Sequence, residues 1–362
     1  MILLSSIIKA FEAEFLEHYQ DSILPSHRQA LSAMKDCRTS ASPQMLAQCT
    51  ACDHQVLVPH PCGHRHCPHC QYQESQQWLE RQLQKQVPAE YFLVTFTLPE
   101  ELRPLAWFHQ RTLYDVMTRC SWETVHTFSQ NDPQLQGTPG AITVLHTHAR
   151  RLDYHPHVHL VMPAAAIDGE KKRWRTKGGK KRKHPSGYLF NHQALAKVFR
   201  AKLLDALRQE GLELPVSYPD TWVVDVKSVG TGEKARVYLG RYLYKGVIQE
   251  KDIIACENGQ VTFRYQDSKT QRIEYRTVSG ARFLWLILQH VLPKGFRRAR
   301  NFGFLHANSK RLITLLQSLL GFDPNRALAG VKQRPKLTCP CCGAVMNIVR
   351  TRIRPVFPVL AQ

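Results

Sequence analysis

The cysteines of this chain are concentrated in two short stretches. Six of the eleven lie between positions 37 and 70, and three lie between positions 339 and 342. A disulfide scaffold of this density is typical of much shorter secreted chains, whereas cysteines paired two residues apart are typical of metal sites. The distribution therefore predicts a small metal-held module near the N-terminus and indicates a reducing, cytoplasmic compartment.

The N-terminal stretch contains two Cys-x2-Cys pairs, Cys49 with Cys52 and Cys67 with Cys70, separated by fourteen residues. This is close to the spacing of a four-cysteine zinc ribbon, in which the pairs surround one tetrahedral Zn²⁺. Four protein ligands leave no open position, so we expect a structural role for this zinc. The ligand set stays open to a Cys/His exchange or a second ion, because further candidate ligands lie in or beside the same loop: Cys62, His66, His54, His60, His64 and His69.

A further pair, Cys339 and Cys342, lies near the C-terminus, and no other pair follows it. Two cysteines make only half of a tetrahedral site. This pair therefore either takes ligands from elsewhere in the chain or consists of reduced thiols at a tight turn, and the sequence favours neither.

A His-x-His motif lies in the middle of the chain, within an apolar stretch at 155–162 that is typical of a strand. Side chains alternate between the two faces of a strand, so His157 and His159 project from the same face while Val158 points to the other. Two imidazoles placed in this way can share one divalent cation. Taken alone, the motif is equally compatible with two hydrogen-bonded surface histidines.

A catalytic metal needs at least one more protein ligand. We expect His146 to supply it, because the strand at 141–148 is predicted to pair with the strand at 155–162 as a hairpin. His148 and His155 are the alternatives. The ligands suit Mg²⁺ or Mn²⁺ as a Lewis acid, and imidazole also suits zinc or nickel, so the identity of the metal stays open.

Two tyrosines follow about eighty residues later, in a segment with helical character. Tyr238 and Tyr242 are four residues apart, so both phenols lie on one helix face and can act as equivalent nucleophiles beside the metal. A phenol has a pKa near 10 and needs a base or a positive field to attack at pH 7. Arg241 and Lys245 could stabilise a phosphate there. The commoner roles of such residues are packing for the tyrosines and solvent exposure for the charged side chains.

Composition indicates a polyanionic partner. The chain has 362 residues, 43% of them hydrophobic, and a formal net charge of +20, with a pI of about 9.7. No apolar run approaches the roughly 18 residues of a membrane-spanning helix, so we expect nucleic acid rather than a membrane. The stretch 171–183 carries nine Lys or Arg and no acidic residue, and is expected to be a loop that can follow a phosphate backbone. The candidate DNA-binding residues are Lys171, Lys172, Arg173, Lys180, Lys181, Arg182, Lys183, Arg241 and Lys245.

Hydrophobic periodicity predicts an α+β fold, with a central antiparallel sheet that carries the histidines, helices on one side of it, and a small N-terminal zinc-binding domain. Strands are expected at 91–98, 141–148, 155–162, 222–226, 261–265 and 273–278, and helices at 7–36, 71–87, 102–128, 193–210, 233–248 and 281–291. We divide the chain into a helical lead-in with the zinc-binding domain at 1–88, a nuclease domain at 89–305, and a C-terminal helical segment with the last Cys-x2-Cys at 306–362.

Taken together, these motifs resemble one known family, the rolling-circle insertion-sequence transposases that combine an N-terminal zinc-binding domain with a His-hydrophobe-His nuclease domain. The resemblance spans most of the chain. The residues that carry it are 37–39, 66–71, 92–99, 145–148, 155–159, 188–190, 198–200, 238–242, 290–296 and the pair Cys339 and Cys342.

The resemblance implies that His157 and His159 hold the metal, while Tyr238 and Tyr242 cleave single-stranded DNA at element ends and become joined to 5′ phosphates. The presence of both tyrosines favours the two-tyrosine branch of the family. In the related conjugative relaxases the tyrosine precedes the histidines, whereas here it follows them.

Two other functions stay open at this point. One is a non-catalytic zinc-ribbon DNA-binding regulator, in which the histidines and tyrosines only pack. The other is a rolling-circle replication initiator, which shares the order of the motifs but is not expected to carry this zinc module. The sequence does not indicate the oligomeric state.

Overall fold

The computed structural model describes residues 2–170, 173–177, 189–231, 247–267, 270–328 and 336–354. All strand pairs in these ranges are antiparallel, and they form one large and two small sheets. Short 3-10 turns in the described part of the chain lie at Gln20–Ser22, Glu100–Leu102, Glu250–Asp252 and Ala307–Ser309. The mixed α+β class expected from the sequence is confirmed.

The central sheet has the strand order β7-β6-β4-β5-β3-β8, with β12 also paired to β4. Its strands are β3 (Glu90–Thr97), β4 (Thr138–His148), β5 (Tyr154–Pro163), β6 (Ala165–Asp168), β7 (Arg173–Thr176), β8 (Val224–Thr231) and β12 (Ala299–Gly303). β4 and β5 form the predicted hairpin, in which His146 lies opposite His157 and Val144 lies opposite His159. The register therefore places a third histidine beside the His-x-His pair.

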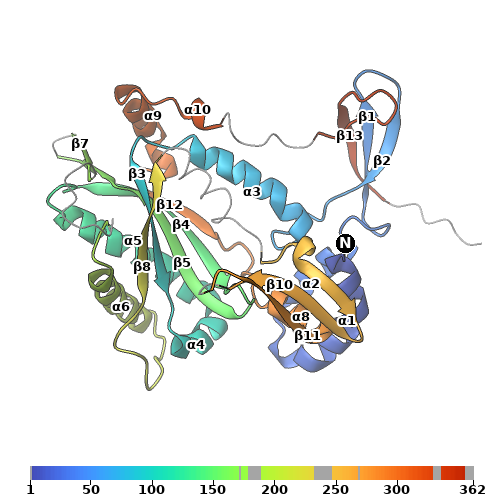
Figure 1. Ribbon diagram of the computed structural model, residues 1–362, viewed down its shortest axis with the longest axis horizontal. Helices are drawn as coiled ribbons and strands as arrows, with labels where there is room; N and C mark the ends of the chain where they lie inside the picture. Colours follow the sequence, from blue (N-terminus) through green and yellow to red (C-terminus); the bar gives the residue numbers. More distant parts are fainter. Residues whose placement is uncertain are drawn as a thin grey trace, which may run out of the picture.

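Three helices cover one face of this sheet: α4 (Arg103–Phe108), α5 (Gln110–Asn131) and α6 (His192–Gln209) (Figure 1). The even-numbered residues of β5, Val158, Leu160 and Met162, point into the core on this side and are fully buried. Because alternate residues of a strand face opposite ways, the odd-numbered histidines must lie on the other face.

Helices also pack on that other face, which corrects the expectation of helices on one side only. Leu93 and Val161 from the sheet form a cluster with Trp78 and Leu83 of α3 (Pro68–Leu83) and Ile313 of α9 (Lys310–Leu319). His157 and His159 lie on the same face of β5 as Val161, so the two histidines lie on the side of the sheet that α3 and α9 cover.

The N-terminal helices pack against a distant part of the chain. α1 (Leu4–Tyr19) and α2 (Pro25–Asp36) share a core with α8 (Gly280–Leu288) and with the small sheet of β9 (Ile253–Glu257), β10 (Gln260–Gln266) and β11 (Ile273–Ser279). Gly280 lies so close to the ring of Phe11 that a Cβ there would be only 2.2 Å from it. Residues on both sides of the predicted boundary at residue 88 thus contribute to one core, and the division into domains stays a prediction.

The third sheet joins the two ends of the chain. β13 (Met346–Ile353) pairs with β1 (Gln44–Cys49), which pairs in turn with β2 (Gln55–Pro59). In Figure 1 this sheet stands apart from the other two. The segment from residue 306 was expected to be helical, and it begins with α9 and α10 (Pro324–Leu328), but it ends in this strand because its hydrogen-bonding partner lies about three hundred residues earlier.

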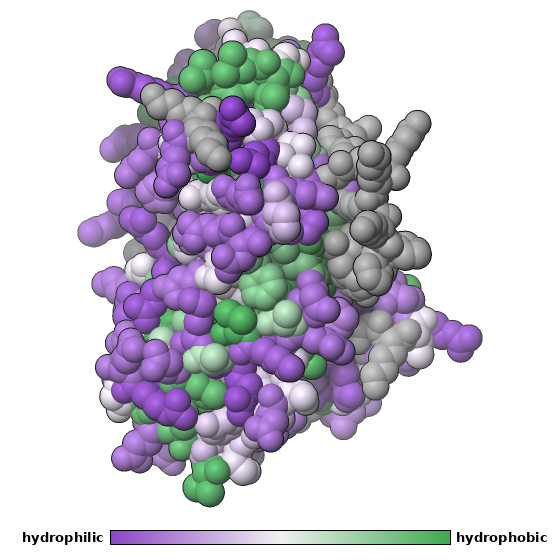
Figure 2. Space-filling view, turned by 90° about the vertical axis from the view of Figure 1, so that its left-hand side faces the viewer, coloured by the Kyte–Doolittle hydropathy of each residue, from purple (hydrophilic) through white to green (hydrophobic). Residues whose placement is uncertain are grey.

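The surface is largely hydrophilic on the side that carries α5, α6 and β7, with a compact hydrophobic patch at the end where α9 lies (Figure 2). Leu312, Leu315 and Leu319 of α9 are exposed. Within the described residues, no helix is both long and apolar enough to cross a membrane.

Two buried histidines make stability depend on pH. Burial lowers the pKa values of His27 and His290 from 6.5 to about 4. Between pH 6.5 and 4 the unfolded chain binds protons at these positions and the folded chain does not, so the free energy of unfolding falls as the pH drops through this window. We expect a loss on the order of 3 kcal/mol per histidine.

Urea unfolding of wild type and His27→Leu at pH 7, 6 and 5 checks this. The Nε2 atom of His27 is buried without a hydrogen-bond partner, so the variant should show a shallower decline with falling pH. His18→Leu on the exposed side of α1 is the matched control and should keep the wild-type slope. Equal slopes in all three proteins would contradict the assignment.

Candidate metal centres

Three imidazole rings converge on the α3-covered face of the central sheet. His157 and His159 lie on β5, and His146 lies on β4. One ligand nitrogen from each ring lies within 4.8 Å of the other two, and the Nε2 atoms of His157 and His159 are 3.0 Å apart. Two nitrogen lone pairs at this separation are compatible only with a shared proton or a cation. The three rings fit a cation site that leaves positions for other ligands.

Hydrogen bonds orient two of these rings. The Nδ1 atom of His157 lies 2.7 Å from the carbonyl oxygen of His155, which can only accept, so Nδ1 carries the proton and Nε2 is left with a lone pair. The Nδ1 atom of His159 lies 3.4 Å from the Thr95 hydroxyl on β3. The carbonyl partner fixes the tautomer of His157, and both partners fix the direction in which their imidazole points.

The electrostatic environment keeps the three imidazoles neutral. Burial lowers the pKa of His157 to about 4 and lowers the pKa values of His146 and His159 well below 6.5, and in each case nearby positive charge acts in the same direction. Neutral imidazole is the form that binds metal. All three residues are therefore in the ligand form throughout the physiological range.

The two alternative third ligands have other partners. The Nδ1 atom of His155 lies 2.9 Å from the Nη2 atom of Arg103, which donates a hydrogen bond to it. The His148 ring lies 5.4 Å from that of His290 and 5.7 Å from that of His146, measured between centroids. Only His146 groups with His157 and His159 among the described residues.

Arg298 is a site residue that sequence reasoning missed. Its Nε donates to the carbonyl oxygen of Leu145 at 3.1 Å, and its backbone carbonyl accepts from the Leu145 N–H. Its charge contributes to the lowered pKa values of all three histidines. The signal was the basic run at 297–300, which directly follows the last motif of the central region.

The predicted tyrosine helix lies outside the described residues, so Tyr238, Tyr242, Arg241 and Lys245 have no structural account here. The same holds for most of the basic stretch at 171–183. Its one described candidate, Arg173, is exposed on β7. β8, which leads into the tyrosine segment, pairs with β3 and places Asp225 opposite Thr95, the residue that contacts His159.

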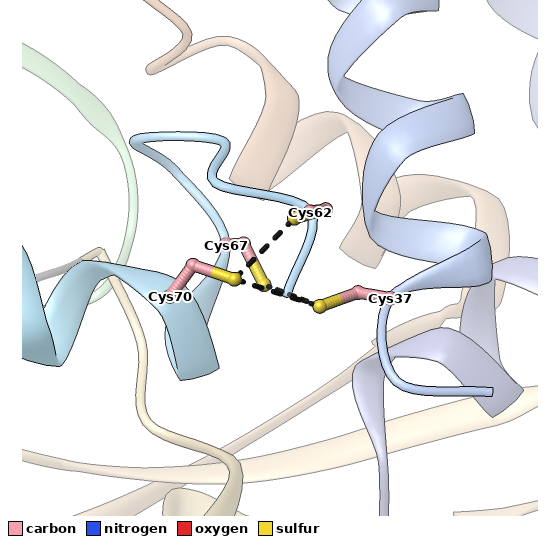
Figure 3. Close-up of side chains that lie close together, drawn as sticks. All are labelled: Cys37, Cys62, Cys67 and Cys70. Atoms are coloured by element: carbon pink, nitrogen blue, oxygen red, sulfur yellow. Dashed lines mark hydrogen bonds between the residues drawn. The ribbon is translucent and has the colours of Figure 1, made fainter. Parts of the chain in front are cut away.

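Four cysteines form a separate cluster at the start of α3 (Figure 3). Cys37 follows α2, Cys67 is the N-cap of α3, Cys70 lies in its first turn and Cys62 comes from the preceding loop. The Sγ atom of Cys70 is 3.6 Å from that of Cys37 and 3.5 Å from that of Cys62. A tetrahedral tetrathiolate zinc site with bonds of about 2.3 Å has sulfur atoms about 3.8 Å apart, so the cluster fits one zinc ion.

The structure corrects the ligand set expected from spacing. Cys67 and Cys70 take Cys37 and Cys62 as neighbours, whereas Cys49 and Cys52 lie beside Cys339 and Cys342. The spacing along the chain was misleading because β1, which ends at Cys49, pairs with β13 and keeps Cys49 and Cys52 apart from Cys67 and Cys70.

His66 does not belong to the cluster of four cysteines, which corrects its place in the expected ligand set. Its Nε2 atom accepts a hydrogen bond from the Leu292 N–H at 3.2 Å. Of the other loop histidines, the Nδ1 atom of His60 lies 2.6 Å from the Pro61 carbonyl oxygen.

The thiols of the Cys37 cluster cannot ionise independently. Hydrogen bonds within the cluster lower the pKa values of Cys70 and Cys37, whereas they raise the pKa values of Cys62 and Cys67. Some thiolates thus form at the expense of the other thiols unless a cation offsets their charge. The α3 N-terminus, which favours negative charge, lies at two of the four cysteines.

The loop between Cys62 and Cys67 connects this cluster to the histidine site. Besides the His66 contact, the Nη1 atom of Arg65 donates to the carbonyl oxygen of Phe296 at 2.6 Å. The segment it holds leads directly to Arg298 beside the three imidazoles. The cysteine cluster and the histidine site are therefore linked by a short series of contacts.

Comparison with known proteins agrees with this arrangement. Residues 7–98 match the family described as "Transposase zinc-binding domain", and residues 140–312 match the family described as "Putative transposase". The first range contains the whole Cys37 cluster and the second contains the three histidines. The zinc-binding match supports a structural Zn²⁺ in the N-terminal part of the chain.

Two relatives cover most of the sequence. "Putative transposase y4qJ" of Sinorhizobium fredii is 30% identical over 358 residues, covering 89% of this chain and 88% of that protein. The "Transposase for insertion sequence element IS801" of Pseudomonas savastanoi pv. phaseolicola is 29% identical over 277 residues, covering 70% of this chain and 64% of that protein. The chain belongs to the family of insertion-sequence transposases with an N-terminal zinc-binding domain, as its motifs indicated. It is therefore a DNA-cleaving and strand-transferring enzyme, and its partner is DNA.

Among solved structures, the conjugative relaxase TrwC in complex with oriT DNA overlaps with 64% of this chain and 72% of that chain, at 13% identity and a TM-score of 0.26. So limited an overlap carries no conclusion about the fold or the reaction.

Proposed function

We propose that this transposase cleaves single-stranded DNA at the ends of a mobile element and joins it to a target by rolling-circle transposition in the cytoplasm. The observation that supports this most strongly is the convergence of His146, His157 and His159, whose ligand nitrogens lie within 4.8 Å of one another. Tyr238 and Tyr242 follow β8 in the sequence, and β8 pairs with β3, the strand whose Thr95 contacts His159.

In the proposed reaction a tyrosine Oη attacks a backbone phosphorus, and the bond from phosphorus to the 3′ oxygen breaks. The phenolic proton is lost, the departing 3′ oxygen takes up a proton, and the DNA ends as a 5′-phosphotyrosine and a free 3′ hydroxyl. Because the phosphodiester is exchanged for a phosphotyrosine ester, a DNA 3′ hydroxyl can reverse the step without ATP. Two tyrosines allow two strand ends to be held in one cycle.

The three imidazoles would hold Mg²⁺ or Mn²⁺, which supplies charge neutralisation and orientation at the phosphate. His146, His157 and His159 provide three neutral nitrogens and leave room for phosphate oxygens. Arg298 adds fixed positive charge beside the same face. Arg241 and Lys245 extend this field if the tyrosine segment is helical.

DNA affinity in this proposal comes mainly from charge. The formal net charge is +20, and the residues assigned to DNA are Lys171, Lys172, Arg173, Lys180, Lys181, Arg182 and Lys183 with Arg241 and Lys245. Each phosphate neutralised on a single strand lowers the slope of log K against log salt by about 0.7. We assign the reaction to residues 89–305, with the cysteine cluster of the N-terminal region bracing that part.

A cleavage assay tests the proposal. The full chain is incubated with single-stranded DNA from the ends of its own element and with Mg²⁺ or Mn²⁺, and is then run on a denaturing gel. We expect cleavage and a covalent adduct, both abolished by EDTA. Binding without any adduct would point to a regulator, and cleavage of plasmid origins but not element ends would point to a replication initiator.

The contact of Arg65 with Phe296 gives a second prediction. Arg65→Ala removes the hydrogen bond that holds the segment leading to Arg298. Small displacements of a catalytic group are costly, so cleavage should slow on the order of ten-fold, with a higher metal concentration needed for half-maximal rate.

Zinc content should stay unchanged in Arg65→Ala, because Arg65 contributes no thiol. Arg28→Ala, an exposed arginine on α2, is the control and should cleave at the wild-type rate. A wild-type rate and metal dependence in Arg65→Ala would show that this contact does not support the site.

A further inference from the structure

A second set of four thiols is assembled from the two ends of the chain. Cys49 ends β1 and Cys52 follows in the next turn, while Cys339 and Cys342 precede β13. The four sulfur atoms lie within 4.8 Å of one another. The Sγ atom of Cys342 lies 3.5 Å from that of Cys49 and 3.7 Å from that of Cys52, and Cys52 and Cys339 are also 3.7 Å apart. These separations match the edge of about 3.8 Å in a tetrathiolate zinc site.

The backbone around these cysteines forms two tight turns. The Ala51 N–H donates to the Cys49 sulfur at 3.3 Å. The Gly343 N–H donates to the Cys339 carbonyl oxygen at 2.9 Å, and Gly343 has a φ of 74°, which favours glycine. Each turn thereby presents both sulfurs of its pair on one side, toward the other pair.

The sheet that carries these turns has almost no hydrophobic core. Its buried residues are Ala47, Cys49, Cys339 and Met346, so two of the four are the cysteines themselves. Leu57, Ile348 and Val349 on the same three strands are 50%, 42% and 53% exposed. A unit this small needs a disulfide or a metal to stay folded.

Disulfides do not account for the arrangement. Bonded sulfurs are about 2.05 Å apart, whereas each described pair here is at least 3.5 Å apart. Cys52 and Cys342 each approach two other sulfurs, which is the pattern of a shared centre rather than of two separate bonds. The Cys37 cluster has its own four thiols and provides none to this group.

We propose that Cys49, Cys52, Cys339 and Cys342 bind a second structural Zn²⁺, which holds the C-terminal strand β13 on the N-terminal hairpin β1–β2. Two of its ligands lie outside the range 7–98 that matches the zinc-binding domain. Four thiolates close the coordination sphere, so the ion has no open position for substrate. Metal binding supplies the folding energy that the small core cannot, and it ties together segments almost three hundred residues apart.

Zinc content of the purified full chain tests this inference. Wild type and Cys339→Ser/Cys342→Ser are kept reduced, freed of loosely bound metal, and measured by elemental analysis per mole of protein. The double variant should contain one equivalent less than wild type, whatever the histidine site holds. Cys341→Ser, an exposed thiol outside the group, is the matched control and should lose none.

Cobalt substitution gives a readout that does not depend on stability. Co²⁺-loaded wild type should show the thiolate charge-transfer intensity of two tetrathiolate sites, and the double variant should show half of it. Cys342→His, which replaces one ligand by another, should keep the ion and shift its visible bands. Hydrogen exchange should become fast at 346–353 in the double variant only. An unchanged zinc content in the double variant, or an equal loss in Cys341→Ser, would overturn the proposal.

Discussion

Replacing His157 by alanine is expected to slow DNA cleavage by about 10³-fold. The substitution removes one of three imidazoles that lie within 4.8 Å of one another. With two ligands left, a divalent cation is held weakly and no longer placed against the phosphate, where its charge lowers the barrier by several kcal/mol. A loss of about 4 kcal/mol corresponds to this factor, at 1.36 kcal/mol per ten-fold change in rate. Single-turnover cleavage over a range of Mn²⁺ concentrations measures it.

The same experiment separates His146 from its neighbours. The cleavage rate of His146→Ala should fall as far as that of His157→Ala, because the centroid of the His146 ring lies 4.5 Å from that of the His159 ring. The cleavage rate of His148→Ala should fall much less, since His148 does not group with His157 and His159 and its ring lies nearer to that of His290 than to that of His146. If His148→Ala were inactive and His146→Ala active, the third ligand would be assigned wrongly.

Replacing Tyr238 and Tyr242 together by phenylalanine is expected to abolish the covalent adduct entirely. Phenylalanine keeps the ring but lacks the oxygen that attacks phosphorus, so no bond to DNA can form. DNA binding should persist, because the affinity depends on basic side chains that are unchanged. Denaturing gels for the adduct and a filter assay for binding separate the two effects.

The single variants and one control complete this prediction. Tyr238→Phe and Tyr242→Phe should each retain adduct formation at one DNA end, if each tyrosine serves a different strand. Tyr244→Phe, two residues beyond Tyr242 in the sequence, should behave as wild type, because helical spacing predicts its ring on another face. An adduct in the Tyr238→Phe/Tyr242→Phe variant would exclude both residues as nucleophiles.

Local sequence patterns predicted which histidines lie side by side. The alternation along 155–162 put His157 and His159 on one face, and a short connection made β4 and β5 a hairpin, so His146 could be placed opposite them. These inferences succeed because strand periodicity and hairpin pairing are local. Arg298 could not be found in this way, since it reaches the site only through the pairing of β12 with β4.

The cysteines show the opposite case. Spacing placed Cys49, Cys52, Cys67 and Cys70 in one site, but spacing constrains only the two cysteines within each Cys-x2-Cys turn. Which turns meet depends on long-range pairing, here of β1 with β13 and of the loop before α3 with the end of α2. The sequence therefore indicated that cysteine pairs gather for a metal, but it did not point to Cys37 as a ligand and could not show which pairs lie together.

The polarity of the covalent bond tests the central claim most directly. Single-stranded element-end DNA is labelled either at its 3′ end or at its 5′ end and incubated with the full chain and Mn²⁺. The proposed attack leaves the protein on a 5′ phosphate, so the 3′ label should migrate with the protein while the 5′ label appears in a free fragment ending in a 3′ hydroxyl. Attachment of the 5′-labelled fragment to the protein, or cleavage without any adduct, would contradict the account.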